Sequence, residues 1–241
     1  MYQKERKKER KKERKKERKK MEKKVAFSQV ELAYFTKLFK LEGQKITRPT
    51  SVTYQNGDIY RGELSIKGNK HGLGIMFYAN GNILQARWAN NQANGSGYLV
   101  SPEGTEMIGI WKNNLLQGKK NKIRFASGTE YKGNTECGKI RGQGAMKYSC
   151  GDVYEGTWVN NELNGYADIK YQDGNTYQGF MLNHERCGLG IYTWSNGNKY
   201  TGNWYKDEVH GDGILDAVNT HDKEFQGPWA LGQQLDIGNE F

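Results

Sequence analysis

Apolar and polar positions alternate along most of the chain in short runs of about five to seven residues. In residues 188–194, for example, glycine or an aromatic residue alternates with Leu, Ile or Thr. Successive side chains of an extended strand point to opposite faces, so a period of two places each set on its own face. The alternation therefore predicts β-strands of ordinary length.

Turn-forming dipeptides separate these runs at a nearly constant distance. Their glycines lie 24, 23, 24, 23, 23 and 23 residues apart. Asn-Gly and Asp-Gly pairs supply the positive φ that a tight hairpin turn needs. The spacing indicates seven repeat units, each one hairpin, and such hairpins gain stability by stacking into a continuous sheet. The dipeptides are Asn56-Gly57, Asn80-Gly81, Glu103-Gly104, Ser127-Gly128, Cys150-Gly151, Asp173-Gly174 and Asn196-Gly197.

Large aromatic residues recur once per unit, in an aromatic-x-Gly step and again two residues after it. A later Gly-x-Gly step completes each regular unit. Positions i, i+2 and i+4 of a strand share one face, so the rings line one side of the sheet. Two roles stay open for them: packing of one hairpin on the next, and a partner-binding groove. The candidate binding residues are Tyr60, Trp88, Trp111, Tyr131, Tyr154, Trp158, Tyr177, Trp194, Tyr200 and Trp204.

This pattern resembles the MORN repeat family. Residues 154–165 are a near-complete copy of its motif, and the resemblance covers roughly residues 54–215, with a degenerate eighth unit and C-terminal cap in 216–241. It implies an all-β fold, an elongated single-layer twisted antiparallel β-meander of about seven to eight hairpins, on the order of 65–70 Å long. Three units depart from the motif: Ala86 replaces the expected glycine in the second, Met107 replaces the expected tyrosine in the third, and the fifth has Ala167 at the second glycine of the Gly-x-Gly step.

The net charge of +10 is confined to the N-terminal end of the chain. Residues 1–24 hold 15 Lys or Arg and 5 Glu, so the remaining residues are neutral. The segment is expected to be either a marginal helix or a solvated arm, and either a solubilising arm or an anchor for acidic surfaces. Its interleaved Glu and lack of aromatics argue against specific nucleic-acid recognition. The expected anchor residues are Lys7, Lys8, Arg10, Lys11, Lys12, Arg14, Lys15, Lys16, Arg18, Lys19 and Lys20.

Residues 25–43 predict one amphipathic helix. Ser28 and Glu31 form a capping box at its start, and Gly43 is placed to end it. Residues 44–53 are expected to be a linker. The helix has three open roles: covering the first edge of the sheet, docking a partner, or lying on a membrane surface. Its apolar stripe consists of Phe27, Val30, Tyr34, Phe35, Leu38 and Leu41.

No catalytic, cofactor-binding or metal-binding residues are expected. His71 and His210 precede a Gly-x-Gly step, at a position that other units fill with Asn or Cys, which indicates a turn. No catalytic or nucleotide-binding motif is present. Three cysteines without C-x-x-C spacing fit a reducing compartment, and the chain shows neither a signal peptide nor a long apolar run.

The resemblance implies a non-catalytic interaction scaffold, since stand-alone members of the family are similar to radial-spoke-head and other cytoskeletal proteins of motile cilia. The expected partners are proteins of a large assembly, including microtubule or axonemal proteins, and the expected location is the cytoplasm, at the axoneme or cytoskeleton. The alternative is a peripheral membrane adaptor that binds anionic phospholipids through the basic tail and helix. Homodimers through the edge strands near Tyr54 and Trp229 stay open.

Overall fold

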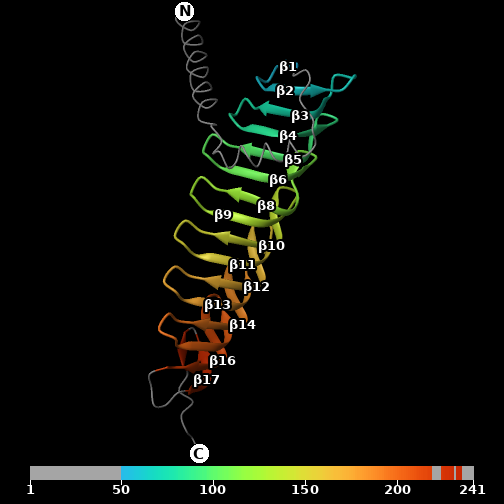
Figure 1. The fold of residues 1–241 in the computed structure, drawn as a ribbon. Helices are drawn as coiled ribbons and strands as arrows, with labels where there is room; N and C mark the ends of the chain where they lie inside the picture. The colour runs from blue at the N-terminus through green and yellow to red at the C-terminus, as the bar shows by residue number, and fades with distance from the viewer. Residues whose placement is uncertain (1–49, 219–223, 231, 235–241) are drawn as a thin grey trace, which may run out of the picture.

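A computed structural model describes residues 50–218, 224–230 and 232–234. The basic tail expected in residues 1–24 and the helix expected in residues 25–43 lie outside this part of the chain. The described residues are all-β and form one elongated array of strands (Figure 1).

Eighteen strands make up the described part of the chain, all in one sheet. Apart from β1, β7 and β18 they are six to nine residues long, close to the length of the alternating runs. The strands are β1 (Thr50–Thr53), β2 (Ile59–Leu64), β3 (Lys70–Phe77), β4 (Ile83–Ala89), β5 (Gln92–Val100), β6 (Glu106–Lys112), β7 (Leu115–Leu116), β8 (Gly118–Arg124), β9 (Glu130–Glu136), β10 (Lys139–Lys147), β11 (Val153–Val159), β12 (Glu162–Lys170), β13 (Thr176–Leu182), β14 (Glu185–Thr193), β15 (Lys199–Tyr205), β16 (Glu208–Asp216), β17 (Glu224–Ala230) and β18 (Gln233–Gln234).

Strands that follow one another in the sequence pair antiparallel, except that β7 and β8 both pair with β6. The sheet is therefore a single-layer meander, which confirms the expected architecture of the described residues. The strand β17 brings the expected eighth unit into the sheet. The strand β1 lies inside the segment expected to be a linker, and it pairs with β2. The sequence did not predict this strand, because its short, mostly polar run of Thr, Ser and Val shows no alternation of apolar and polar residues.

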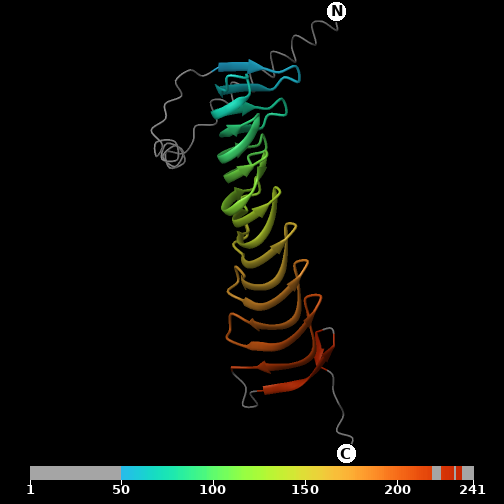
Figure 2. The same ribbon diagram turned by 90° about the vertical axis from the view of Figure 1, so that its right-hand side faces the viewer.

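The sheet is bent into a trough. A register shift interrupts the pairing within seven of the hairpins, beginning with the shift between Gly62 and Glu63. Such β-bulges bend a strand and strengthen its twist. Figure 2 shows the strands of the C-terminal half as arcs that curve around one side of the sheet. We call that side the inner face and the opposite side the outer face.

The two glycines of a Gly-x-Gly step meet different needs. Gly142 has a φ of 92°, which L side chains rarely adopt, and it lies in the bulged part of β10. Gly144 needs space instead, because a Cβ there would overlap the ring of Tyr131 from the neighbouring strand. The inner face can therefore bury a tyrosine against bare backbone once per regular unit.

The units are joined along both edges of the sheet by side-chain caps. At the hairpin tips, Asn161 Oδ1 accepts the Ile140 N–H at 2.9 Å, while the Asn161 N–H donates to the Ile140 carbonyl at 2.9 Å. At the opposite edge, the Gln172 N–H donates to Asp152 Oδ1 at 2.8 Å. These bonds link residues 20 or 21 apart, so they hold a hairpin to the previous one beyond the strand ladder.

Candidate partner-binding face

The first row of aromatic residues on the inner face forms the core. Each tyrosine of this row lies over glycines of its own and the next strand, and its hydroxyl donates to a backbone carbonyl at 2.8–3.1 Å. The four side chains are at most 1% exposed. Desolvation is the largest cause that raises their phenol pKa, to about 12 for Tyr131. The residues are Tyr60, Tyr131, Tyr177 and Tyr200.

Tryptophans of the following unit complete this row. Tyr60 meets Trp88 edge to face, with ring centroids 5.5 Å apart, and Tyr131 meets Trp158 in the same way at 5.9 Å. The indole N–H of Trp88 donates to the Gly74 carbonyl at 3.0 Å. Such buried, hydrogen-bonded rings contribute mainly to stability.

Most of the ten candidate binding residues therefore serve packing. Eight are 6% exposed or less, and among these Trp111 borders the cavity of the third unit, while the others are covered by the core. Tyr154 and Trp194 are half-buried and reach the trough. The eight buried residues are Tyr60, Trp88, Trp111, Tyr131, Trp158, Tyr177, Tyr200 and Trp204.

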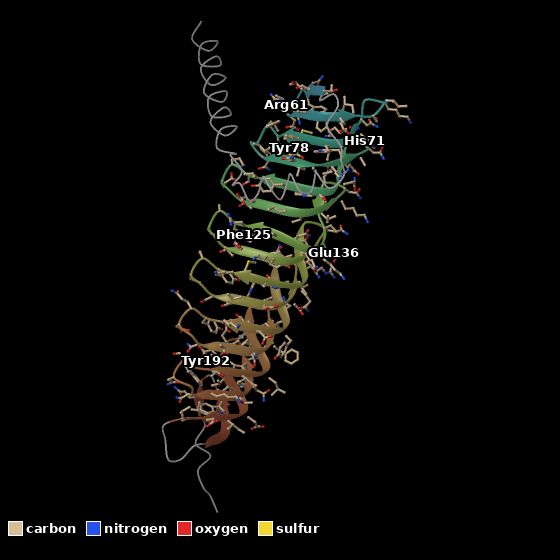
Figure 3. All side chains as sticks on the ribbon, in the orientation of Figure 1. Arg61, His71, Tyr78, Phe125, Glu136 and Tyr192 are labelled. Atoms are coloured by element: carbon tan, nitrogen blue, oxygen red, sulfur yellow. The ribbon has the colours of Figure 1, made fainter. Side chains whose placement is uncertain are left out.

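A second row of rings lines the trough and is half-buried. Most of its members stand three residues before a turn glycine, where their carbonyl accepts the glycine N–H. In the C-terminal half they touch one another, as Tyr148 touches Tyr154 at 4.9 Å between centroids. Figure 3 labels Tyr78, Phe125 and Tyr192 along one side of the array, and His71 and Glu136 along the other. The row consists of Tyr54, Tyr78, Phe125, Tyr148, Tyr154, Tyr171, Tyr192 and Trp194.

The sequence reasoning missed six of these eight residues. Five of the six, Tyr54, Tyr78, Phe125, Tyr148 and Tyr171, stand three residues before a turn glycine. This constant offset is the sequence signal that identifies them, and Tyr192 lies outside it.

Two cations lie within the rows of rings. The Arg186 guanidinium carbon lies 4.2 Å from the centroid of the Trp204 ring, and its Nε donates to Asp207 Oδ1 at 3.0 Å. Lys70 Nζ lies 4.6 Å from the centroid of Trp88, and desolvation lowers the pKa of this amine. Both are cation–π arrangements, made by the chain with its own side chains.

The third unit interrupts the second row. Ser101 stands where the neighbouring units have Tyr78 and Phe125, and the trough here holds a cavity of about 610 Å³. Beside the cavity, the buried Asn121 side chain lies over Gly109, as a tyrosine ring lies over glycine in the regular units. Asn121 Oδ1 accepts the Ile110 N–H at 3.0 Å, and Nδ2 donates to Thr135 Oγ1 at 2.6 Å.

The described residues hold no group of three or more His, Cys, Asp or Glu that could bind a metal ion. Nor does any helix among them have the length and apolarity needed to cross a membrane. His71 and His210 are exposed, at the hairpin edge of the sheet. The polar side chains of the turns bond mainly to backbone N–H groups, which is a structural role.

The model of one protein family matches this chain. It is the MORN repeat model, and it matches residues 60–83, 85–106, 154–176 and 177–199. The matched segments cover the strands β2 to β5 and β11 to β14. Residues 107–153 are unmatched, and this gap includes the irregular return strand of the third unit, β7 and β8.

Curated relatives match a short part of the chain. An inactive protein tyrosine kinase pTKL of Plasmodium berghei is 31% identical over 72 residues, which is 30% of this chain and 6% of that protein. The protein of the same name from Plasmodium falciparum is 29% identical over 72 residues, 30% of this chain and 5% of its own length. This chain thus spans less than a tenth of these relatives.

Two solved structures have a backbone that is partly similar to this chain. The TCP domain of SAS-4 from Drosophila melanogaster, in complex with a proline-rich motif of Ana2, covers 77% of this chain and 94% of its own, with 12% identity and a TM-score of 0.41. The TCP10 domain of Danio rerio CPAP, in complex with a STIL peptide, covers 75% and 94%, with 14% identity and a TM-score of 0.29.

Proposed function

This chain is a MORN-repeat protein, and we propose that it works as a non-catalytic protein-interaction scaffold of the ciliary axoneme or a related cytoskeletal assembly. The observation that carries the proposal is the second row of half-buried rings, which runs along the trough from Tyr54 to Trp194. The ciliary setting rests on the family resemblance.

Half-buried tyrosine and tryptophan rings suit a protein partner. They offer apolar area together with a polar atom, they lose little conformational entropy on binding, and they are enriched among residues that dominate interface energy. Two strands of about 4.8 Å spacing separate equivalent rings of successive units, so the rings recur about every 10 Å. An extended segment or a helix laid along the trough would meet several of them.

The chemistry of the trough favours binding over catalysis. The phenols of Tyr148, Tyr171 and Tyr192 have their pKa raised, chiefly by desolvation, and are neutral at physiological pH. A neutral phenol presents a hydrogen-bonding group to a partner without acting as a nucleophile.

Extraction of the source cell with a non-ionic detergent tests this proposal. The full chain is expected to stay with the insoluble cytoskeleton. Tyr171→Ser, in the trough, should release it, whereas Tyr166→Ser, a matched change on the outer face of β12 where the side chain is 52% exposed, should not. Release of the unchanged chain into the cytosol before detergent is added would reject the scaffold.

A membrane adaptor is the second candidate, favoured by the distribution of charge. Residues 106–147 hold nine Lys or Arg against three Glu, whereas residues 148–218 hold four against ten Asp or Glu. Exposed basic side chains such as Lys132 stand on the outer face of this central part. Each cation near an anionic membrane contributes about 1 kcal/mol.

Vesicles with and without anionic phospholipid decide between the two candidates. An adaptor should bind the anionic vesicles, lose this binding as salt rises, and bind more weakly as Lys132→Glu. If the full chain does not bind anionic vesicles at low salt, the adaptor proposal is wrong.

A further inference from the structure

The third unit opens a cavity in the trough. Its cavity has a floor of Leu99, Met107 and Trp111, and a rim formed by turns from both edges of the sheet. The volume of about 610 Å³ falls in the range of pockets that hold a ligand or an anchoring side chain. The units before and after place an aromatic ring at the position of Ser101, so the opening is local to this unit.

The floor of the cavity is apolar, while polar side chains such as Asn80, Asn82 and Asn114 also line it. Leu116 is buried at one side of the cavity. Leu115 stands at its rim and is 45% exposed, so a large apolar side chain faces solvent here. Glu103 is the one charged residue among the lining side chains. A charged occupant would gain little here, and an apolar side chain would cover Leu115 as well as fill the cavity.

We propose that residues 25–43 of the same chain dock in this cavity through their apolar stripe. The stripe repeats at the i, i+3, i+4 spacing of a helix that needs an apolar surface to cover it, from Phe27 through Tyr34 to Leu41. The segment carries two Lys and two Glu, so it is neutral overall, as the cavity requires. The basic residues 1–24 are excluded as the occupant by the same argument.

The length of the tether brings Gly43 within reach of this cavity. Residues 44–49 connect the segment to β1, and six residues span at most about 20 Å. The strands β5 and β6, which carry the floor, are four and five strand spacings from β1, or roughly 19–24 Å. The strand β11, where the contiguous half-buried rings of the C-terminal half lie, is nine spacings from β1, or about 43 Å, which is beyond the reach of Gly43.

Docking there divides the trough between the chain and its partners. The N-terminal part is occupied by the chain itself, and the C-terminal part, with the contiguous rings from Tyr148 to Trp194, is left for another protein. This inference is independent of the proposed function, because it concerns a contact within one chain.

Hydrogen exchange of the full chain, followed residue by residue, tests the proposal. Amides of residues 25–43 should exchange at least tenfold more slowly in the unchanged chain than in Leu115→Asp, which places a charge at the rim. Leu189→Asp is the matched control, since this leucine is 64% exposed on the outer face, and it should leave the protection of residues 25–43 unchanged. Both changed residues are exposed, so both variants should fold.

A second variant fills the cavity instead of charging it. Ser101→Phe restores the ring found at Phe125 in the next unit and should abolish the protection of residues 25–43, whereas Ser127→Phe, on an exposed turn, should not. Exchange of residues 25–43 at the rate of an unstructured chain, or protection that survives both Leu115→Asp and Ser101→Phe, would overturn the proposal.

A photoreactive residue in place of Tyr34 identifies the contact directly. The variant is mixed with an isotope-labelled copy of itself before illumination. Each cross-link should join position 34 to Met107, Leu115 or Leu116 of the same chain. Adducts that join labelled to unlabelled chains, or that fall outside the third unit, would contradict docking within the same chain.

Discussion

The contact between a tyrosine ring and a bare glycine is the smallest unit of this fold. Tyr131 covers Gly133 and Gly144, and its hydroxyl donates to the Asn134 carbonyl at 2.8 Å. Glycine within a strand normally weakens it, because it adds entropy to the unfolded chain and leaves nothing to pack. Here the missing side chain is the space that the neighbouring ring occupies.

A double-mutant cycle measures this contact. Gly144→Ala should lower the free energy of unfolding by about 1–3 kcal/mol, because the added Cβ overlaps the Tyr131 ring. In a Tyr131→Ala background the same change should cost less than about 1 kcal/mol, since the ring is gone. Urea unfolding of the unchanged chain, the two single variants and the double variant gives the coupling free energy between the two positions. An equal cost of Gly144→Ala in both backgrounds would show that the Tyr131 ring is not the reason for glycine at position 144.

The buried phenols predict a loss of stability at high pH. Their pKa is raised in the folded state, to about 12 for Tyr131, while the unfolded chain titrates near 10. The neutral form is therefore favoured by folding, and this stability is complete below about pH 10 and lost as pH rises through 12. Urea midpoints should fall between about pH 10 and 12, and native tyrosines that all titrate near 10 by absorbance would contradict the prediction.

The hairpin is the next scale, and its tips are conformationally demanding. Asn160 and Asn161 both have positive φ, 52° and 76°, as a two-residue type I′ turn requires. Asn161 adds the bonds to Ile140 that hold its hairpin to the previous one.

Two substitutions at Asn161 separate these roles. Asn161→Gly keeps the backbone conformation and loses the side-chain bond, which should cost about 0.5–1.5 kcal/mol. Asn161→Ala also places a Cβ in the left-handed region, and should cost about 1–2 kcal/mol more. Thermal or urea unfolding measures both, and equal destabilisation would mean that the backbone conformation carries no cost.

The repeat, the strands and the antiparallel meander were predictable because period and alternation are local features of the sequence. The bend of the sheet was not predictable from the sequence. It arises from β-bulges, and the free energy of a bulge depends on how the two paired strands fit together. For the same reason, the sequence could not tell that Tyr60 is buried while Tyr78, in an equally aromatic position, is half-exposed. The alternation of residues identifies the face of the sheet on which a side chain lies. How deeply that side chain is buried in the trough depends on the neighbouring units.

At the scale of the whole molecule, the array is one continuous trough whose chemistry changes along its length. The third unit holds the cavity at Ser101, the centre is basic on its outer face, and the C-terminal half has the contiguous rings and an excess of Asp and Glu. Each part of the rod thus offers a different surface, while the core beneath it repeats.

Photo-cross-linking in the source cell tests the central claim, that the trough binds a protein, most directly. A photoreactive residue in place of Tyr171, in the trough, is compared with one in place of Phe180, on the outer face and 49% exposed. The account predicts a discrete protein adduct from position 171, absent from position 180. Adducts with lipid alone from position 171, or the same protein from both positions, would contradict it.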